Sequence, residues 1–130
     1  MLKSSDYIGK IVIARFPYFD ISSNKIKFKA RPVLIIGCEF EKLPCDFNVL
    51  PISKVSDGSK INNLYDFKLN KIECDKLNLK SIPSYIRTHK QYIVNSREVH
   101  SDIVSDLKND LKNIYDEVEK LNKKYNSDLF

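Results

Sequence analysis

The chain has 130 residues and a formal net charge of +5, with 42% hydrophobic and 30% charged residues. These values are typical of a soluble globular protein, and one domain of this length buries enough core to fold without a disulfide or a metal. The apolar runs are far shorter than the roughly 20 residues that span a bilayer. With no apolar stretch of the secretory type near the start, we expect a cytoplasmic protein with a single domain over residues 1–130.

The cysteines, the histidines and the distribution of charge narrow the possible classes of function further. Three cysteines and two histidines do not form any zinc-ligand spacing, so we expect reduced thiols, no metal and no cofactor. Residues 1–100 hold 17 Lys and Arg against 10 Asp and Glu, whereas residues 101–130 hold 5 against 7. A basic body with a mildly acidic tail attracts polyanions such as nucleic acids, although many basic proteins bind none.

The first half of the chain contains strong strand signals. Residues 8–16 are rich in β-branched residues and predict a strand that is buried on both sides and ends at Pro17. A polar loop follows over residues 20–25. Residues 26–37 predict a second strand, in which Pro32 requires a bulge or a strand edge because proline donates no backbone hydrogen bond.

Further short strands are predicted at residues 47–52 and 64–69, separated by a loop around residues 56–59. Residues 85–94 predict one bent strand or two short ones. Strand after strand in so short a chain favours a small barrel or sandwich, here over residues 7–98 or so.

Near the end of the chain, the apolar residues recur with the period of a helix and not with that of a strand. Ser101 is a good N-cap, and a helix is predicted from about residue 102 to 125. Its apolar stripe recurs every three or four residues at Ile103, Leu107, Leu111, Ile114, Val118 and Leu121. The fold class expected is therefore α+β, mainly β, with one long C-terminal amphipathic helix.

Four motifs follow one another at the predicted strand ends. They read Phe16-Pro17-Tyr18-Phe19-Asp20, Arg31-Pro32-Val33-Leu34-Ile35, Pro51-Ile52-Ser53 and Ser84-Tyr85-Ile86-Arg87, after Gly9 before the first strand. In this order and at this spacing, over roughly residues 8–120, the series resembles the MazF/PemK family of toxins from toxin–antitoxin systems. The resemblance implies an SH3-like small β-barrel, as in MazF, PemK and CcdB.

The same resemblance implies a function. Such a protein would be a sequence-specific, metal-independent endoribonuclease that cleaves single-stranded RNA by attack of the ribose 2′-hydroxyl on the adjacent phosphate. The products carry a cyclic phosphate and a 5′-hydroxyl. The expected partners are the RNA substrate, a second copy in a homodimer and a cognate antitoxin. We expect residues 103–111 to pack on the protein's own barrel and the helix from Val118 onward to extend the dimer interface.

Four residues are predicted to be catalytic by this resemblance. Arg31 matches the family's Arg-Pro arginine, whose planar guanidinium binds two phosphate oxygens at once. Ser53 matches a hydroxyl that hydrogen-bonds the scissile phosphate. Arg87 matches a second arginine. His89 stands where some relatives have an acid, and histidine titrates near neutral pH. The competing interpretations are a surface arginine, a turn-capping serine and an exposed histidine.

The remaining candidates flank Arg31 and Ser53 and would contact RNA: Phe16, Asp20, Lys25, Lys27, Lys29 and Lys54. A solvated charged loop explains the lysines equally well, and strand-end aromatic residues more often fill a core. Two other functions remain open on the same fold. One is a non-catalytic toxin that poisons DNA gyrase by protein contact, and the other is a relative that only binds nucleic acid.

Overall fold

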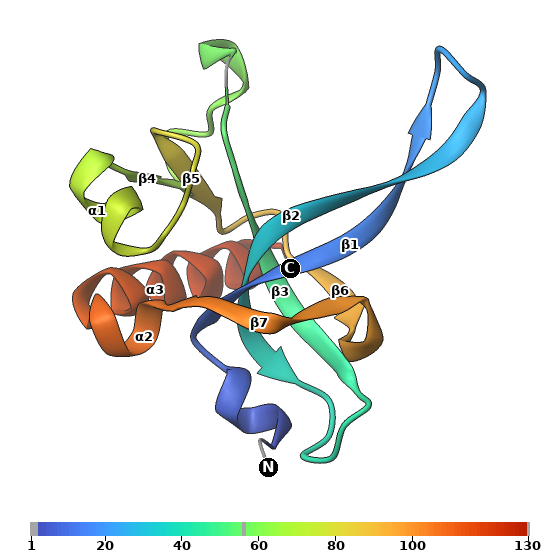
Figure 1. The fold of residues 1–130 in the computed structure, drawn as a ribbon. Coiled ribbons are helices and arrows are strands. Elements are labelled where there is room, and N and C mark those ends of the chain that lie inside the picture. The colour runs from blue at the N-terminus through green and yellow to red at the C-terminus, as the bar shows by residue number, and fades with distance from the viewer. Residues whose placement is uncertain (1–2, 56, 130) are drawn as a thin grey trace.

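The computed structural model describes residues 3–55 and 57–129, apart from the side chain of Phe16. These residues form an α+β structure in which a curled, antiparallel sheet makes a half-barrel that is covered on one side by a C-terminal helix (Figure 1). The architecture is consistent with the small β-barrel expected from the sequence. The strands are β1 (Lys10–Asp20), β2 (Lys25–Cys38), β3 (Asp46–Ser53), β4 (Asp66–Leu69), β5 (Ser84–Arg87), β6 (Tyr92–Asn95) and β7 (Val99–Asp106).

The helices are short except for the last. They are α1 (Lys71–Lys76), α2 (Leu107–Asp110) and α3 (Lys112–Asp128), with 3-10 turns η1 (Ser4–Tyr7), η2 (Gly58–Lys60) and η3 (Ser96–Glu98). No helix within the described residues is long and apolar enough to cross a membrane.

The sheet has the strand order β4-β5-β3-β2-β1-β7, and β6 also pairs with β3. Strand β3 is its centre: it pairs with β2 on one side, and with β6 and then β5 on the other. Because side chains alternate between the faces of a strand, the sheet buries one hydrophobic cluster on each face. One cluster contains Ile11, Leu34, Leu50 and Ile52, and the other contains Val12, Val33, Phe47 and Val49.

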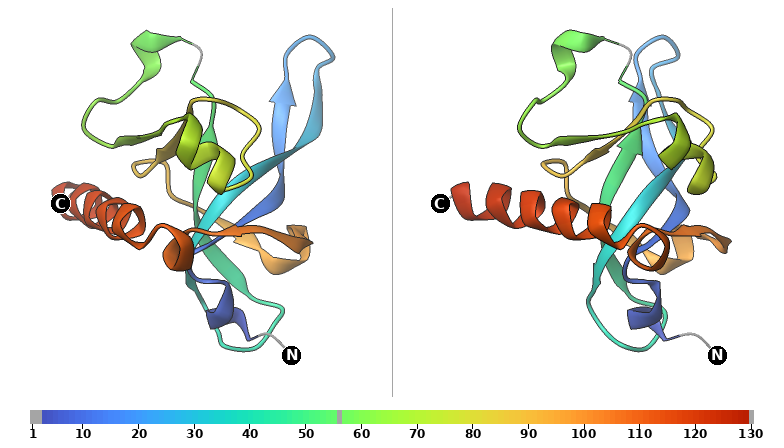
Figure 2. Two further views of the ribbon diagram at one scale, coloured as in Figure 1. Left: turned by 60° about the vertical axis from the view of Figure 1, so that its left-hand side comes forward. Right: turned by 90° about the vertical axis from the view of Figure 1, so that its left-hand side faces the viewer.

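Strands β1 and β2 continue past the sheet as a two-stranded ribbon. Their pairing runs unbroken from Ile11–Leu34 to Asp20–Lys25, whereas β7 accompanies β1 only as far as Ala14. The ribbon projects away from α3 in Figures 1 and 2. The predicted strand end at Pro17 is therefore wrong. Proline is tolerated there because β1 has β2 on one side only, so its other edge needs no hydrogen-bond donor.

The two short strands β5 and β6 confirm one of the alternatives predicted for residues 85–94. At Pro32 the structure has no bulge. Pro32 pairs regularly with Ile13, and the β2–β3 pairing begins one residue later, at Val33. Its missing donor therefore faces an open edge, the second alternative, and the bulge of β2 lies between Ile35 and Gly37 instead.

The helix predicted from about residue 102 begins later. Residues 99–106 form β7, in which Ile103 pairs with Val12, and the helical part starts at Leu107. Asp106 caps α2 by accepting a hydrogen bond from the backbone N–H of Asn109, a role that the sequence reading gave to Ser101. The helix is then interrupted at Leu111, before α3 begins. Non-local pairing with β1 overrides the helical periodicity of this short segment.

The second half of the helix, which we expected to extend a dimer interface, begins with a residue that is buried within the molecule. Val118 is fully buried in the protein's own core, next to Leu107 and Tyr115. Further along α3, Asn122 donates to the backbone carbonyl of Thr88. The apolar stripe of α3 is therefore used within the molecule, where it closes one face of the half-barrel.

Helix α1 was not anticipated, although its start has a clear sequence signal. Asn70 accepts a hydrogen bond from the N–H of Glu73, and the Glu73 carboxylate accepts one from the N–H of Asn70. This reciprocal capping box satisfies two donors that the helix would otherwise leave unpaired. Buried Cys74 and Leu77 attach the helix to the core and so position the segment that follows it.

Candidate nucleic-acid interface

A row of positive charge follows the outer half of β2. Lys25, Lys27, Lys29 and Arg31 occupy every second position, while Ile26, Phe28 and Ala30 lie between them. In a strand, this alternation places the four cations on one face and the apolar residues on the other. Neighbouring cations on the row are then roughly 6–7 Å apart along the strand, from a rise of about 3.3 Å per residue.

Aromatic rings stabilise cations on the ribbon. The Lys29 ammonium lies 4.3 Å from the ring centroid of Tyr18, which belongs to the same face because Tyr18 pairs with Lys27. On the opposite face the Arg15 guanidinium lies 3.8 Å from the ring centroid of Phe28. Such cation–π contacts hold flexible side chains in place and leave flat surfaces beside them. The side chain of Phe16, another predicted RNA contact, lies outside the described part of the structure.

Asp20 shapes the turn of the ribbon. Its carboxylate accepts hydrogen bonds from the hydroxyls of Ser22 and Ser23 and lies 2.7 Å from the Lys27 ammonium. The contact with Lys27, followed by those with the two serines, lowers the pKa of Asp20 to about 2. Asp20 is therefore ionised at neutral pH and neutralises part of the charge of Lys27, whereas no carboxylate of the described residues forms a salt bridge with Lys25 or Lys29. These contacts give Asp20 a role in forming the turn, and the predicted contact with RNA stays a prediction.

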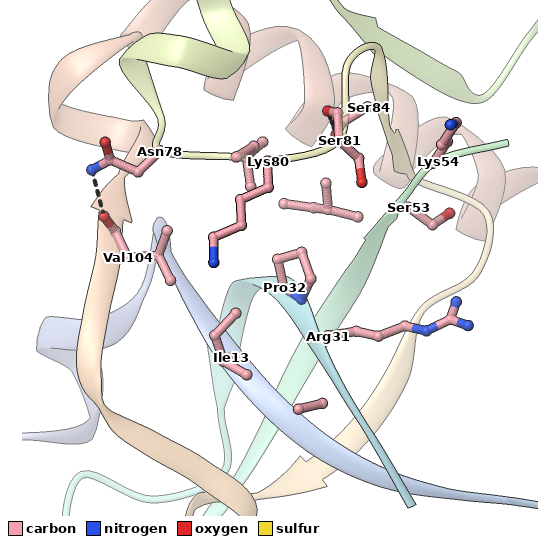
Figure 3. Close-up of a pocket in the computed structure, with 13 residues that line it drawn as sticks. Ile13, Arg31, Pro32, Ser53, Lys54, Asn78, Lys80, Ser81, Ser84 and Val104 are labelled. Atoms are coloured by element: carbon pink, nitrogen blue, oxygen red, sulfur yellow. Dashed lines mark hydrogen bonds between the residues drawn. The ribbon is translucent and has the colours of Figure 1, made fainter.

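Arg31 and Ser53 share the basic face at the inner end of the row. Arg31 and Val33 are two residues apart and therefore lie on the same face of β2. Val33 pairs with Pro51, and Ser53 lies two residues after Pro51 on the same face of β3. Figure 3 shows both side chains pointing the same way, away from Lys80 and Val104. The Ser53 hydroxyl makes no hydrogen bond within the described residues and is only partly buried, so it is accessible to a ligand.

Tyr92 of β6 lies beside Arg31. Burial raises the pKa of the Tyr92 phenol above its ordinary value, and the positive charge of Arg31 acts in the opposite direction. Tyr92 pairs with Val49, which places it on the same face as Arg31 and Ser53. Sequence reasoning missed this residue because only the pairing of β6 with β3 places it near Arg31.

A pocket of about 590 Å³ opens at this point of the sheet (Figure 3). Arg31, Ser53 and Lys54 lie on its lining, which brings three of the predicted site residues together. The rest of the lining comes from β1, β2, β3, β5, β7 and the segment after α1, and among the described residues it contains no carboxylate or histidine. The arrangement binds anions well, since it offers guanidinium, ammonium and hydroxyl donors without a competing negative charge.

Arg87 and His89 lie elsewhere, in a cluster around Asp66. The Arg87 guanidinium donates to both carboxylate oxygens of Asp66, at 3.0 and 3.2 Å, and also to the backbone carbonyl of Lys60. The Asp66 side chain is fully buried. His89 reaches the same carboxylate, with Nδ1 at 3.7 Å from Oδ1. The two side chains share a side of the segment as predicted, but neither lines the pocket of Arg31.

The surroundings of His89 are mostly aromatic. Its ring stacks on Tyr65 and meets Tyr125 of α3 edge-on, and only 10% of its side chain is exposed. Burial lowers the pKa of His89 below its ordinary value, and the charges of Arg87 and Lys90 add to this, whereas Asp66 opposes it. His89 is thus neutral at pH 7 and buried against α3, which is the environment of a packing residue.

Comparison with known proteins does not add a family assignment. No protein-family model matches the chain, and a comparison with curated proteins finds no significant match. Among the described residues, no three His, Cys, Asp or Glu side chains converge as potential metal ligands. The features of the chain that suggest a function are the basic row of β2, the pair Arg31 and Ser53, and the pocket beside them.

Proposed function

We propose that the protein is an endoribonuclease toxin that binds single-stranded RNA along the basic row of β2 and cleaves it beside Arg31 and Ser53. The observation that carries the proposal is the placement of Arg31 and Ser53 on one face, at the inner end of a row of three lysines. The family resemblance in the motifs adds the reaction, without a metal, together with a cytoplasmic location, a homodimer and a neutralising antitoxin.

The basic row suits an extended single strand. Cations at regular intervals along a groove follow a phosphate backbone, and exposed rings beside them stack on bases without selecting a sequence. Tyr18 provides a partly exposed ring beside Lys27 and Lys29. Ionic attraction to the row therefore supplies affinity, and selectivity has to come from another part of the site.

Arg31 and Ser53 have distinct roles in the reaction. The bond from the 2′-oxygen to phosphorus forms while the bond from phosphorus to the 5′-oxygen breaks, so negative charge accumulates on the non-bridging oxygens. Arg31 holds two of these oxygens, and the Ser53 hydroxyl donates to one. Lys54 adds positive charge at the edge of the pocket.

The proton steps are assigned to solvent. The lining of the pocket holds no carboxylate or imidazole, so hydroxide removes the 2′-hydroxyl proton and water protonates the departing 5′-oxygen. This assignment replaces the acid–base role considered for His89. It gives Arg87 and His89 the task of holding β5 against β4 and α3. A cleavage rate that rises steadily with pH from 6 to 9 is expected, and a bell-shaped profile would contradict the assignment.

The decisive experiment is cleavage of an end-labelled, unstructured RNA in EDTA by purified protein. Arg31→Ala is expected to reduce the rate roughly 100-fold or more, because it removes a donor from the charged transition state. Arg97→Ala, an exposed arginine of η3, serves as the matched control and should change the rate less than about threefold. Discrete cuts ending in cyclic phosphate support the proposal, whereas a folded protein that cuts none of several diverse RNAs contradicts it.

A second candidate function is binding of single-stranded nucleic acid without cleavage. It is favoured by the lack of any acid or base on the pocket lining and by the separation of His89 from Arg31. In that case Arg31→Ala would weaken RNA binding measured by fluorescence anisotropy, and the bound RNA would be recovered intact.

A further inference from the structure

The pocket beside Arg31 has an apolar interior that phosphate binding does not explain. Its walls are formed by Ile13, Pro32, Ile52, Leu79 and Val104, which come from β1, β2, β3, β7 and the segment after α1. These side chains lie on the sheet face opposite to Arg31, because Ile13 pairs with Pro32 and alternates with Ala14, the partner of Arg31. Arg31 and Ser53 line the same pocket as these apolar side chains, so a strand of RNA held at Arg31 lies at the mouth of an apolar cavity.

One ammonium group occupies the middle of this cavity. Figure 3 shows the Lys80 side chain extending down into the space between Val104 and Pro32. Within the described residues no carboxylate forms an ion pair with Lys80, and the lining contains no acid. An unpaired ammonium over apolar walls favours a ligand that combines a flat apolar body with hydrogen-bond acceptors.

The segment that carries Lys80 is anchored on both sides. Before it, buried Leu79 packs in the core, and the Asn78 side-chain amide donates to the carbonyl of Val104. After it, the hydroxyl of buried Ser84 donates to the carbonyl of Ser81. Fixed points on either side reduce the freedom of the backbone at Lys80, so the ammonium is presented to the cavity in a defined region and can discriminate between ligands.

We propose that this cavity is a base-specificity pocket that receives a keto nucleobase, guanine or uracil, from the RNA strand whose phosphate lies at Arg31 and Ser53. The proposal rests on the RNA-binding function proposed above and adds its selectivity. Lys80 has three donors and no acceptor. It pairs with the carbonyl oxygen of guanine, beside N7, or with that of uracil. Adenine and cytosine present an amino group at that position, and its hydrogens face the ammonium unfavourably.

The test uses short RNAs in which one position varies among G, U, A and C in an otherwise adenosine background. A 2′-O-methyl group on the ribose whose hydroxyl would attack prevents cleavage, so that dissociation constants are measured by fluorescence anisotropy. We expect G or U at one position to bind roughly tenfold more tightly than A or C, as for one hydrogen bond to a charged group. The separate G and U oligonucleotides distinguish the two bases.

Three variants isolate Lys80. Lys80→Met keeps the length of the side chain but loses the donors, and is expected to make the four bases equivalent. Lys80→Arg keeps donors and should retain the preference within about threefold. Lys76→Met replaces an exposed lysine of α1 that is not on the pocket lining and should leave the preference unchanged. A preference that survives Lys80→Met, or equal binding of all four bases by the unmodified protein, overturns the proposal while RNA cleavage remains intact.

A second measurement separates this proposal from the cleavage proposal. The four nucleoside 3′-monophosphates are added in turn to isotope-labelled protein, and backbone amide shifts are followed by NMR. Shifts of Leu79, Lys80 and Val104 with the guanosine and uridine compounds, weaker with the other two, support the pocket even if no RNA is cut. No shifts at these residues with any of the four compounds overturn it, even if RNA is cut.

Discussion

Arg87 illustrates how one side chain acquires a structural task from its neighbours. The carboxylate of Asp66 is fully buried and receives two hydrogen bonds from Arg87, in addition to one from the N–H of Asn62. Loss of a partner leaves a buried charge uncompensated, which is far more costly than loss of an exposed ion pair. We therefore expect Arg87→Ala to lower the free energy of unfolding by roughly 3 kcal/mol, measured by urea denaturation.

Two controls accompany the Arg87 measurement. Arg97→Ala removes an exposed arginine and should change stability by less than about 0.5 kcal/mol. The double variant Asp66→Asn with Arg87→Ala should recover part of the loss, because it removes the buried charge itself. If Arg87→Ala alone costs under about 1 kcal/mol, water solvates Asp66 well enough that the ion pair is not needed.

His89 makes the stability of the protein depend on pH in a defined direction. Its pKa is lower in the folded protein than in the unfolded chain, since burial opposes the charged form. The unfolded chain then binds more protons near and below the ordinary histidine pKa of about 6.5, so the stabilisation is complete above that pH and is lost as the pH falls through the folded pKa.

Replacement of His89 by a neutral ring tests this linkage. Between pH 7.5 and 5, the free energy of unfolding of His89→Phe should fall less than that of the unmodified protein. His100→Gln changes the other histidine, whose side chain is 61% exposed, and should retain the original pH dependence. Parallel curves for the unmodified protein and His89→Phe would show that His89 does not titrate differently on unfolding.

Helix α3 is held in place by apolar side chains that are buried in the core of the same chain. Val118 has no exposed surface and packs with Leu107 and Tyr115. Truncation of a buried side chain leaves a cavity, so Val118→Ala is expected to cost about 2 kcal/mol in thermal or urea unfolding. Glu117→Ala on the exposed side of α3 is the control, with an effect below about 0.5 kcal/mol. An unchanged stability combined with a loss of self-association would instead return Val118 to an interface.

The molecule as a whole separates its charge between the sheet and the tail. Residues 1–100 carry the excess of Lys and Arg, including the row on β2, whereas residues 101–130 carry an excess of Asp and Glu. In Figures 1 and 2 the β1–β2 ribbon and α3 lie on different sides of the body. A polyanion therefore meets the ribbon face with attraction and the acidic tail with repulsion.

The salt dependence of RNA binding tests whether the RNA phosphates contact the lysines of the ribbon. Each phosphate contact contributes about −0.7 to the slope of log affinity against log salt concentration for a single strand. Replacing Lys25 and Lys29 by Gln should make the slope shallower by about 1.4. The same change at Lys120 and Lys124 of α3 should leave it unaltered. Equal slopes for the two double variants would mean that RNA does not lie on the ribbon.

Local pattern alone located much of the sheet. Strands β3, β5 and β6 were predicted close to their observed positions, because each is a short run of β-forming residues between turn signals. The alternation of cations and apolar residues in β2 also predicts a two-sided strand, so the basic row was open to prediction. Arg31 and Ser53 were found through motifs, and the β2–β3 register then placed them on one face.

The tertiary structure alone decided three other features. Residues 102–106 fit a helical stripe, yet pairing of Ile103 with Val12 makes them a strand, since the bonds to a distant segment outweigh a few residues of helical period. Arg87 and His89 contact buried Asp66, which lies 21 residues before Arg87, and do not join Arg31 in its pocket. The pocket around Lys80 joins segments from β1 to β7.

The difference between what the sequence predicted and what the tertiary structure decided follows from how far apart in the sequence the interacting residues are. Turn geometry, strand alternation and helix capping depend on residues a few positions apart, so the sequence by itself determined where most elements lie and which faces they have. Burial and pairing depend on which distant surfaces meet, because the free energy of a buried charge or an apolar face is set by what covers it. Only the folded chain therefore decided which charged residues face a ligand and which hold the structure together.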